Sequence, residues 1–331
     1  MIFPYYCEWS AWIDMLKYLV KRLLTLIPVL LGVTFITFIL MDIAPGDPAE
    51  IMLSRRDIEV TPENLDRARE ALGLKEPLPV RYFGWLQDVM RGNLGISFTT
   101  GEPVTREIIS RLPATAELAA GGLAVMFIMA LPLGTAAALL KGKAGDHLGR
   151  LAALIGASIP SFYLGLLLIT YVAVPIAWIP VMGRGEGLIG LLLPSITLGF
   201  GLAATYARLL RANLLEVLQL DFIRSARSRG LKETVIIGNH ALRNALIPVV
   251  TLLGITLGHL LGGTVVIERI FAWPGVGRLA VDAIFDRNYP VIQGYVLLMG
   301  VAFVFLNLLI DISYRFLDPR VKMEEGEGQM R

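Results

Sequence analysis

Long apolar stretches constrain this chain more than any other feature. Six of them reach about 20 residues, the length that a helix rising 1.5 Å per residue needs to cross the hydrocarbon core of a bilayer. They cover residues 23–41, 115–140, 151–174, 188–207, 245–267 and 291–310. Hydrophobic residues make up 55% of the 331 and charged residues only 18%, far from the composition of a soluble domain. We therefore predict an all-α membrane protein with six transmembrane helices.

Proline occurs inside several of these stretches. Pro28, Pro132, Pro160, Pro194 and Pro248 would break a helix in water. Neighbouring spans in a membrane bundle can satisfy the carbonyl groups that proline leaves free. The sequence thus predicts kinked spans rather than a different fold class.

Lysine and arginine are concentrated in alternate loops, and the positive-inside rule assigns such loops to the cytoplasm. The enriched segments contain Lys17, Lys21, Arg22, Lys141, Lys143, Arg150, Arg208, Arg211, Arg224, Arg227, Arg229, Lys232, Arg243, Arg315, Arg320 and Lys322. The opposite short loops hold Arg184, Arg269, Arg278 and Arg287. This distribution predicts both termini inside. Residues 42–113, between the first two spans, then form an external insertion.

The external insertion carries its own helix signals. Thr61 is a capping residue, Pro62 occupies the first helical position, and Gly73 supplies a stop after an amphipathic run. A second amphipathic stretch covers residues 80–90. Two interpretations stay open, a cap that stabilises the bundle and a docking platform for an external protein.

Residues 1–14 differ in character from the rest of the chain. They are aromatic and irregular, whereas Met15 opens a basic run that leads directly into the first span. We interpret 1–14 as an N-terminal extension, with an interfacial segment anchored by its aromatic side chains as the alternative. Residues 15–331 then form a single membrane domain.

Motifs of nucleotide, metal and acyl-transfer chemistry are absent from the sequence. It contains no phosphate-binding loop, no H-E-x-x-H, no paired-cysteine pattern and no G-x-S-x-G elbow. We expect no catalytic, cofactor or metal site. Ionisable residues within or at the ends of the spans are few, namely Glu117, His259 and Asp311, which disfavours an ion-coupled carrier because such carriers place coupling groups near the midplane.

The segment 221–248 predicts a helix, an elbow and a second helix. Asp221 is placed to cap a helix over 222–229, Gly230 to end it, and Lys232 to begin the next. Ser225 and Ala226 would allow a partner backbone to approach closely, and arginines such as Arg227 could reach acidic groups. Binding of these arginines to anionic lipid headgroups is the alternative.

The same segment resembles the cytoplasmic signature of ABC importer permeases, E-A-A-x-x-x-G. Gly230 and Ala226 match, whereas Arg224 stands in place of the Glu and Ser225 in place of the first Ala. The run His240 to Pro248, HALRNALIP, resembles the version in the dipeptide/oligopeptide/nickel branch. Further stretches that resemble the first permease subunit of that branch are PGDP at 45–48, LGIS at 94–97, residues 262–294, and LDPR at 317–320.

The resemblance implies a type I ABC importer permease fold, with the external insertion at 42–113 and a cytoplasmic coupling loop at 211–244. It implies a second homologous permease, two ATPase subunits that hold ATP and Mg, an external solute-binding protein, and surrounding membrane lipid. Nucleic acid is not among the implied partners. The residues that match the coupling motif or flank it are Asp221, Arg224, Ser225, Ala226, Arg227 and Gly230. The setting would be the prokaryotic inner membrane, with peptides, or nickel or a related small solute, as cargo.

Ser158, Ser161, Tyr163 and His259 are candidates for lining a translocation path. Hydrogen bonding between closely packed helices is the competing interpretation of the two serines, and packing that of the histidine. Two other function classes remain open at this point. One is a secondary carrier or channel that works without an ATPase, and the other is a membrane scaffold or sensor that uses the insertion for a ligand.

Overall fold

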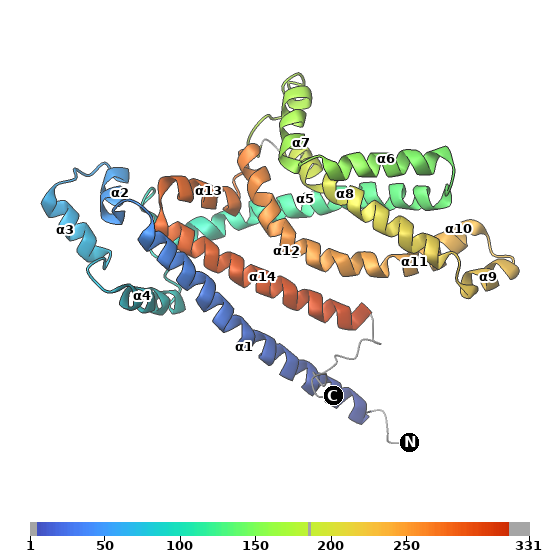
Figure 1. Cartoon of the computed structure of the whole chain (residues 1–331), viewed down its shortest axis with the longest axis horizontal. Coiled ribbons are helices and arrows are strands. Elements are labelled where there is room, and N and C mark those ends of the chain that lie inside the picture. Colours follow the sequence, from blue (N-terminus) through green and yellow to red (C-terminus); the bar gives the residue numbers. More distant parts are fainter. Residues whose placement is uncertain (1–4, 185–186, 318–331) are drawn as a thin grey trace. The chain divides into compact units, whose positions relative to one another are not determined.

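Helices dominate the structure. The computed structural model describes residues 5–184 and 187–317, and this part of the chain contains no β-strand, the one isolated bridge joining Ile96 and Pro103 (Figure 1). The predicted all-α class is confirmed. In chain order the elements are α1 (Tyr5–Ile43), α2 (Pro48–Arg55), α3 (Pro62–Ala71), α4 (Leu78–Met90), α5 (Val104–Leu139), α6 (Ala144–Ser158), α7 (Ser161–Leu168), the π-helix η1 (Ile169–Ala173), α8 (Ile189–Val217), α9 (Asp221–Ser228), α10 (Glu233–Val235), the π-helix η2 (Ile236–Ala241), α11 (Leu242–Ala245), α12 (Ile247–Ile270), α13 (Val276–Asp286) and α14 (Tyr289–Leu317).

Within residues 5–184 and 187–317, four helical segments are long and apolar enough to cross a membrane. They are Leu24–Ile43 within α1, Val104–Leu139, Ile189–Val217, and Tyr289–Leu306 within α14. Two bent pairs raise the total to as many as six, namely Ala144–Ser158 with Ser161–Ala173, and Glu233–Ala245 with Ile247–Gly258. Each of the six stretches predicted from the sequence overlaps one of these segments or pairs.

The third predicted span is not one straight helix. α6 ends at Ser158, Ile159 adopts an extended conformation, and α7 begins at Ser161, so that the two halves meet at 97°. Pro160 explains the break, because the residue before a proline is disfavoured in the helical region. The Pro160 kink therefore divides the predicted span at a defined point.

The helix predicted to run from Lys232 to Pro248 ends at Ala245. It consists of α10, η2 and α11, and the chain turns at Leu246 before α12 begins, with a bend of 42° between the two halves. Pro248 falls in the first turn of α12, where its missing N–H is no loss. The predicted helix is continuous over residues 233–245, and only its predicted end at Pro248 was wrong, because this proline lies in the first turn of the next helix.

The chain divides into two compact units. The first comprises Met1–Pro113 and Leu279–Leu308, and the second Ala114–Arg278 and Leu309–Arg331. The boundaries fall inside α5, α13 and α14, so none of these three helices belongs wholly to one unit.

Polar contacts in the first unit tie the external insertion to residues 286–288. Asn288 is buried, accepts the N–H of Phe98 at 3.0 Å and donates to Ser97 Oγ at 2.8 Å. Arg287 donates to the carbonyl of Pro45 at 2.8 Å, and Asp286 pairs with an arginine of α2, Arg55, at 2.9 Å. The residues between α13 and α14 thus hold both ends of the insertion.

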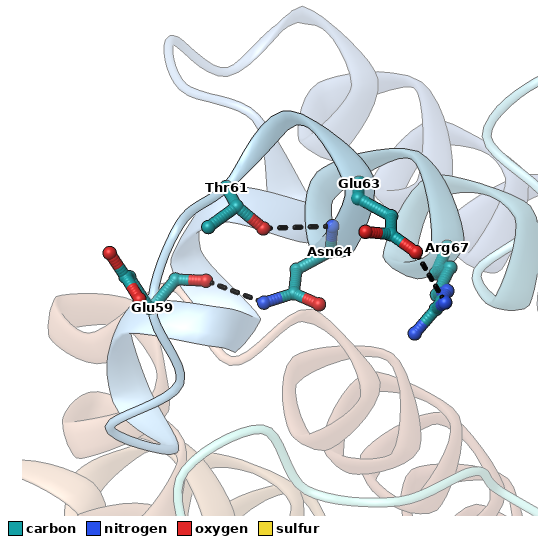
Figure 2. A network of polar contacts seen from close by, with 5 residues as sticks. All are labelled: Glu59, Thr61, Glu63, Asn64 and Arg67. Atoms are coloured by element: carbon teal, nitrogen blue, oxygen red, sulfur yellow. Dashed lines mark hydrogen bonds and ion pairs between the residues drawn. The ribbon is translucent and has the colours of Figure 1, made fainter.

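The predicted helix at the centre of the insertion is confirmed in α3. Figure 2 shows Thr61 accepting the N–H of Asn64 at 3.2 Å, while the Asn64 amide donates to the carbonyl of Glu59 at 2.9 Å. Glu63 and Arg67 pair one turn apart. Gly73 follows the helix with φ of +65°, the left-handed conformation that a C-terminal stop requires.

α8 forms the core of the second unit. Its buried face includes Tyr206, Leu210 and Leu214, and the Tyr206 hydroxyl donates to Thr256 of α12 at 2.6 Å. Glycines bring α5 and α8 to backbone contact, because a Cβ added at Gly199 would lie 2.4 Å from the carbonyl oxygen of Gly122. Small residues at helix contacts are the usual means of close packing in membranes.

Candidate functional site

α9 is the helix of the predicted coupling motif, and its anchor is apolar. Ile223 is 0% and Ala226 2% exposed, and both belong to the buried cluster that includes Leu214 of α8 and Ile236 of η2. An eight-residue helix has little stability of its own in water, so this packing holds it in place. Ala226 therefore holds α9 against α8 and η2, and its methyl group is not accessible to a partner.

The opposite face of α9 is open to solvent. Arg224 has 72% and Asp221 93% of its side chain exposed, and Ser225 and Ser228 are exposed between them. Phe222 at the flank is 41% exposed. The accessible surface thus combines two short side chains with charged groups and one aromatic ring.

The predicted cap of α9 is displaced by one residue. Leu220 occupies the capping position, and Asp221 is the first helical residue, where its side chain makes no capping hydrogen bond. The prediction that Asp221 caps the helix was wrong, although its carboxylate still lies in the first turn, where the helix dipole favours negative charge. Arg224 contacts this carboxylate at 3.4 Å.

The elbow after α9 has the predicted geometry. Gly230 has φ of +77°, a conformation that favours glycine. Arg227 before the elbow donates to Glu233 after it at 2.7 Å and 3.4 Å. This contact raises the pKa of Arg227 above its usual value, so the guanidinium stays charged. A two-point ion pair across the turn limits the angles that the two helices can adopt.

A second ion pair near the same end of the second unit was not predicted. Arg211 of α8 donates two parallel hydrogen bonds of 2.8 Å to Asp146 of α6, whose side chain is 3% exposed. The N–H of Gly142, at φ of +77°, donates to the same carboxylate at 3.1 Å. From the sequence, Arg211 could be identified only as one of the loop cations.

A cavity of about 170 Å³ lies between α5, α6 and α8 of this unit. Small and apolar side chains line most of it, and Arg150, Arg208 and Arg211 contribute to its wall. Its lining includes none of the four residues proposed for the path.

Three of the four path candidates lie at the Pro160 break. Ser158 is exposed and donates to the carbonyl of Leu154 at 2.9 Å, Ser161 opens α7, and Tyr163 is 50% exposed. A serine bonded to its own preceding turn needs no partner helix. His259 belongs to α12, and its side chain is outside the described residues.

A buried carboxylate that sequence reasoning missed is Glu268, in the last turn of α12. It is 0% exposed, accepts a hydrogen bond from Thr115 at 2.7 Å, and accepts the N–H of Arg278 at 2.9 Å. Gly275 and Gly277 make room for it, since a Cβ at Gly275 would lie 2.2 Å from the carboxylate. The glycine pair after a glutamate was the available signal.

Hydrogen bonds also fix the turn between α12 and α13, beside Glu268. Trp273 is 1% exposed and its indole donates to the carbonyl of Ala114 at 2.7 Å, while Val276 donates its N–H to Thr115 at 2.9 Å. A buried acid with several donors is a satisfied structural group. Among the described residues, no group of three or more His, Cys, Asp or Glu side chains could hold a metal ion.

Comparison with known families gives two matches that together cover most of the chain. Residues 130–323 match the family described as binding-protein-dependent transport system inner membrane component. Residues 15–119 match the N-terminal membrane component of the same systems.

Curated relatives are similar over nearly their whole length. A glutathione transport system permease protein, GsiC, from Pectobacterium atrosepticum is 41% identical over 308 residues, which are 93% of this chain and 99% of the relative. GsiC proteins from Salmonella typhimurium and Escherichia coli K12 are 39% and 38% identical with the same coverage.

Solved structures agree on the fold. A chain from inward facing conformations of the MetNI methionine ABC transporter superposes with a TM-score of 0.53 and 20% identity, covering 63% of this chain and 95% of its own length. A second crystal form gives 0.51 and 21%. These chains support the type I importer fold and, at this identity, the fold alone. Taken with the helical spans and the family matches, they establish that the chain belongs to the inner membrane component family of binding-protein-dependent transport systems, as a multi-pass permease subunit of an ABC importer whose ATP hydrolysis resides in separate subunits.

Proposed function

We propose that this permease subunit imports short peptides. Several relatives with 38–41% identity are named as permeases for glutathione, which is a tripeptide. Coverage of 93% of this chain means that the relatives' path-forming helices have counterparts here. A peptide carries its charge and hydrogen-bonding groups on a flexible chain, and membrane spans with few ionisable residues suit such a cargo.

We further propose the composition of the assembly. A second homologous permease completes the pore, and two ATPase subunits with ATP and Mg act from the cytoplasm on the coupling loop 211–244. An external solute-binding protein delivers the cargo. Both termini lie in the cytoplasm, as the distribution of lysine and arginine indicates, and this chain binds no cofactor of its own.

The observation that carries the coupling proposal is the division of α9 into two faces. Ile223 and Ala226 fix the helix on the second unit, and Ser225 and Ser228 leave the outer face low enough for a partner backbone to approach. The ion pair between Arg227 and Glu233 stiffens the elbow toward α12. A movement of an ATPase against α9 would thus be transmitted to a span, as a two-state bundle requires.

The test compares a large side chain introduced on the exposed face of α9 with the same side chain introduced at an exposed position of α2. Ser225→Trp fills the proposed contact without touching the buried anchors, and Ser54→Trp, at an exposed position of α2, is the matched control. The tagged permease is co-expressed with the partner permease and ATPases, and the ATPase recovered per permease is measured after purification. We expect Ser225→Trp to lose the ATPase and keep the partner permease, while Ser54→Trp retains both.

Recovery of the ATPase with Ser225→Trp at the level of the unmodified chain would refute α9 as the contact. The cargo is tested separately in proteoliposomes, by measuring ATP-dependent uptake of labelled glutathione and of a dipeptide. Uptake of neither peptide, in vesicles that retain binding-protein-stimulated ATP hydrolysis, would refute a peptide cargo and leave the coupling proposal untouched.

A further inference from the structure

α4 of the external insertion packs directly against the first membrane span. The Tyr82 hydroxyl lies 2.9 Å from Thr34 Oγ1 and 3.0 Å from the carbonyl oxygen of Leu31. The Tyr82 ring meets those of Phe35 and Phe38 edge-on, with centroids 5.0 Å and 5.7 Å apart. Both helices belong to the first unit, and α4 lies beside α1 (Figure 1).

These contacts set the depth of α4 relative to the span. The apolar span is Leu24–Ile43, and Phe38 precedes its last residue by five positions, about 7 Å along a helix axis. Arg81 pairs with Asp42 at 2.6 Å, and its guanidinium lies 5.5 Å from the centroid of the Phe38 ring. Thr34, which Tyr82 reaches, is about 14 Å from the end of the span. The contacts of α4 with α1 therefore extend from about 7 Å to about 18 Å below the end of the span, at Phe38 and Leu31, along roughly its C-terminal half.

The part of α4 that α1 does not cover has two different sides. Val80, Phe83 and Met90 are 52%, 66% and 76% exposed, and positions 83 and 90 are seven residues apart, on one side of a helix. Asp88 is exposed on another side, about 140° around the axis from Phe83 and about 160° from Met90, whereas Gln87 is exposed between Phe83 and Val80. The exposed surface therefore changes from apolar to polar around the helix axis.

We propose that α4 is an interfacial helix whose apolar stripe, Val80, Phe83 and Met90, inserts into the acyl chains of one bilayer leaflet. It is the leaflet at the C-terminal end of α1, the outer one when the N-terminus is inside. The lipid occupant follows from depth, because a stripe held beside residues 34–38 of a membrane span lies where acyl chains are. If α4 were part of a docking platform in water, it would contact residues of α1 outside the apolar span Leu24–Ile43.

The external insertion would then be attached at two places, to the rest of the first unit and to the membrane. Its ends are held through Asn288 and Arg287, and its middle is held by the leaflet. α3, which carries exposed Glu63 and Arg67, then stays in water while α4 does not. The insertion is neither a simple cap nor wholly a docking platform.

Spin-label accessibility tests the proposal in the assembled transporter in phospholipid vesicles. The cysteine at position 7 is replaced in Cys7→Ser, and single labels are introduced through Phe83→Cys and Met90→Cys on the stripe and Asp88→Cys on the polar side. Ile36→Cys, 57% exposed within the span, is the lipid reference, and Arg67→Cys in α3 is the water reference. Collision rates with oxygen, which concentrates in acyl chains, and with a water-soluble nickel chelate are compared.

Labels at Phe83→Cys and Met90→Cys are expected to favour oxygen as strongly as Ile36→Cys, and Asp88→Cys to shift toward the Arg67→Cys value. Access of the chelate to positions 83 and 90 equal to that at position 67 would overturn the proposal by placing the stripe in water. Protection from both reagents would overturn it by showing a protein partner on the stripe. Two stripe positions are used so that one poorly folded variant does not decide the result.

Discussion

Gly275 is the residue whose missing side chain has the clearest structural reason. A Cβ there would lie 2.2 Å from the Glu268 carboxylate, which Thr115 and the N–H of Arg278 hold in place. The carboxylate cannot move aside without losing these hydrogen bonds. We predict that Gly275→Ala lowers the unfolding free energy of the purified transporter by about 1–3 kcal/mol, the usual range for overpacking.

Thermal unfolding of the purified transporter checks this prediction. Gly201→Ala in α8 is the matched control, because a Cβ there meets nothing within 4 Å and alanine favours a helix. Equal melting temperatures for the two variants would mean that the turn beside Glu268 has free space. The Glu268 carboxylate could then move away from the added methyl group, and the prediction would be wrong.

At the residue scale, the sequence predicts local features such as helix caps, but it does not predict which distant residues pair with each other. Thr61 and Gly73 could be predicted because a cap and a left-handed stop depend on near neighbours in the chain. Arg211 could not be paired with Asp146, since 65 residues separate them and no local pattern links them. The hydrogen bond between Glu268 and Thr115 could not be predicted for the same reason, because 153 residues separate them.

The element most open to a clean test is α3. Thr61→Ala removes the acceptor for the N–H of Asn64, and a lost cap costs about 1 kcal/mol, roughly fivefold in local opening. We predict correspondingly faster amide exchange in the first turn of α3. Glu63→Ala breaks an exposed pair in the same turn and should change the exchange little; the capping role is rejected if both variants exchange alike.

The elbow between α9 and α10 should depend on charge pairing. We predict that Arg227→Glu and Glu233→Arg each reduce binding-protein-stimulated ATP hydrolysis severalfold, because like charges would open the turn. The double exchange restores opposite charges and should recover most of the stimulation. Failure of the double variant to recover, with the ATPase still bound, would show that the pair does not set the angle of α9.

α9 also decides which substitutions report on coupling. Ala226→Glu would bury a carboxylate among Leu214 and Ile236, so its effects would report on folding and not on a partner contact. Ser225 is the informative neighbour, since it is exposed one residue earlier.

The membrane elements could be located from hydrophobicity, but their breaks could not all be predicted. Pro160 marks one break in the sequence, and the structure has a break at the same place. The π-helices η1 and η2 arise within apolar or mixed segments without any proline or glycine pair that distinguishes them. Such turns depend on packing against other helices, which a single sequence does not display.

At the scale of the whole molecule, Asn288 joins parts of the first unit that are far apart in the chain. Asn288→Ala leaves the buried N–H of Phe98 without this acceptor, at a cost of about 1–3 kcal/mol. We predict faster limited proteolysis at residues 97–101 in the assembled transporter. Gln87→Ala, at an exposed position of α4, is the control, and equal cleavage of both variants would contradict the role of Asn288.

The same contact has a consequence for biosynthesis. Asn288 is translated 190 residues after Phe98, which at about 5–20 residues per second is roughly 10–40 s later. Residues 114–278 of the second unit are synthesised in that interval. Part of the first unit is therefore made early but completed late. An external protease that cleaves at residues 97–101 would distinguish nascent chains in which Asn288 has reached Phe98 from those in which it has not.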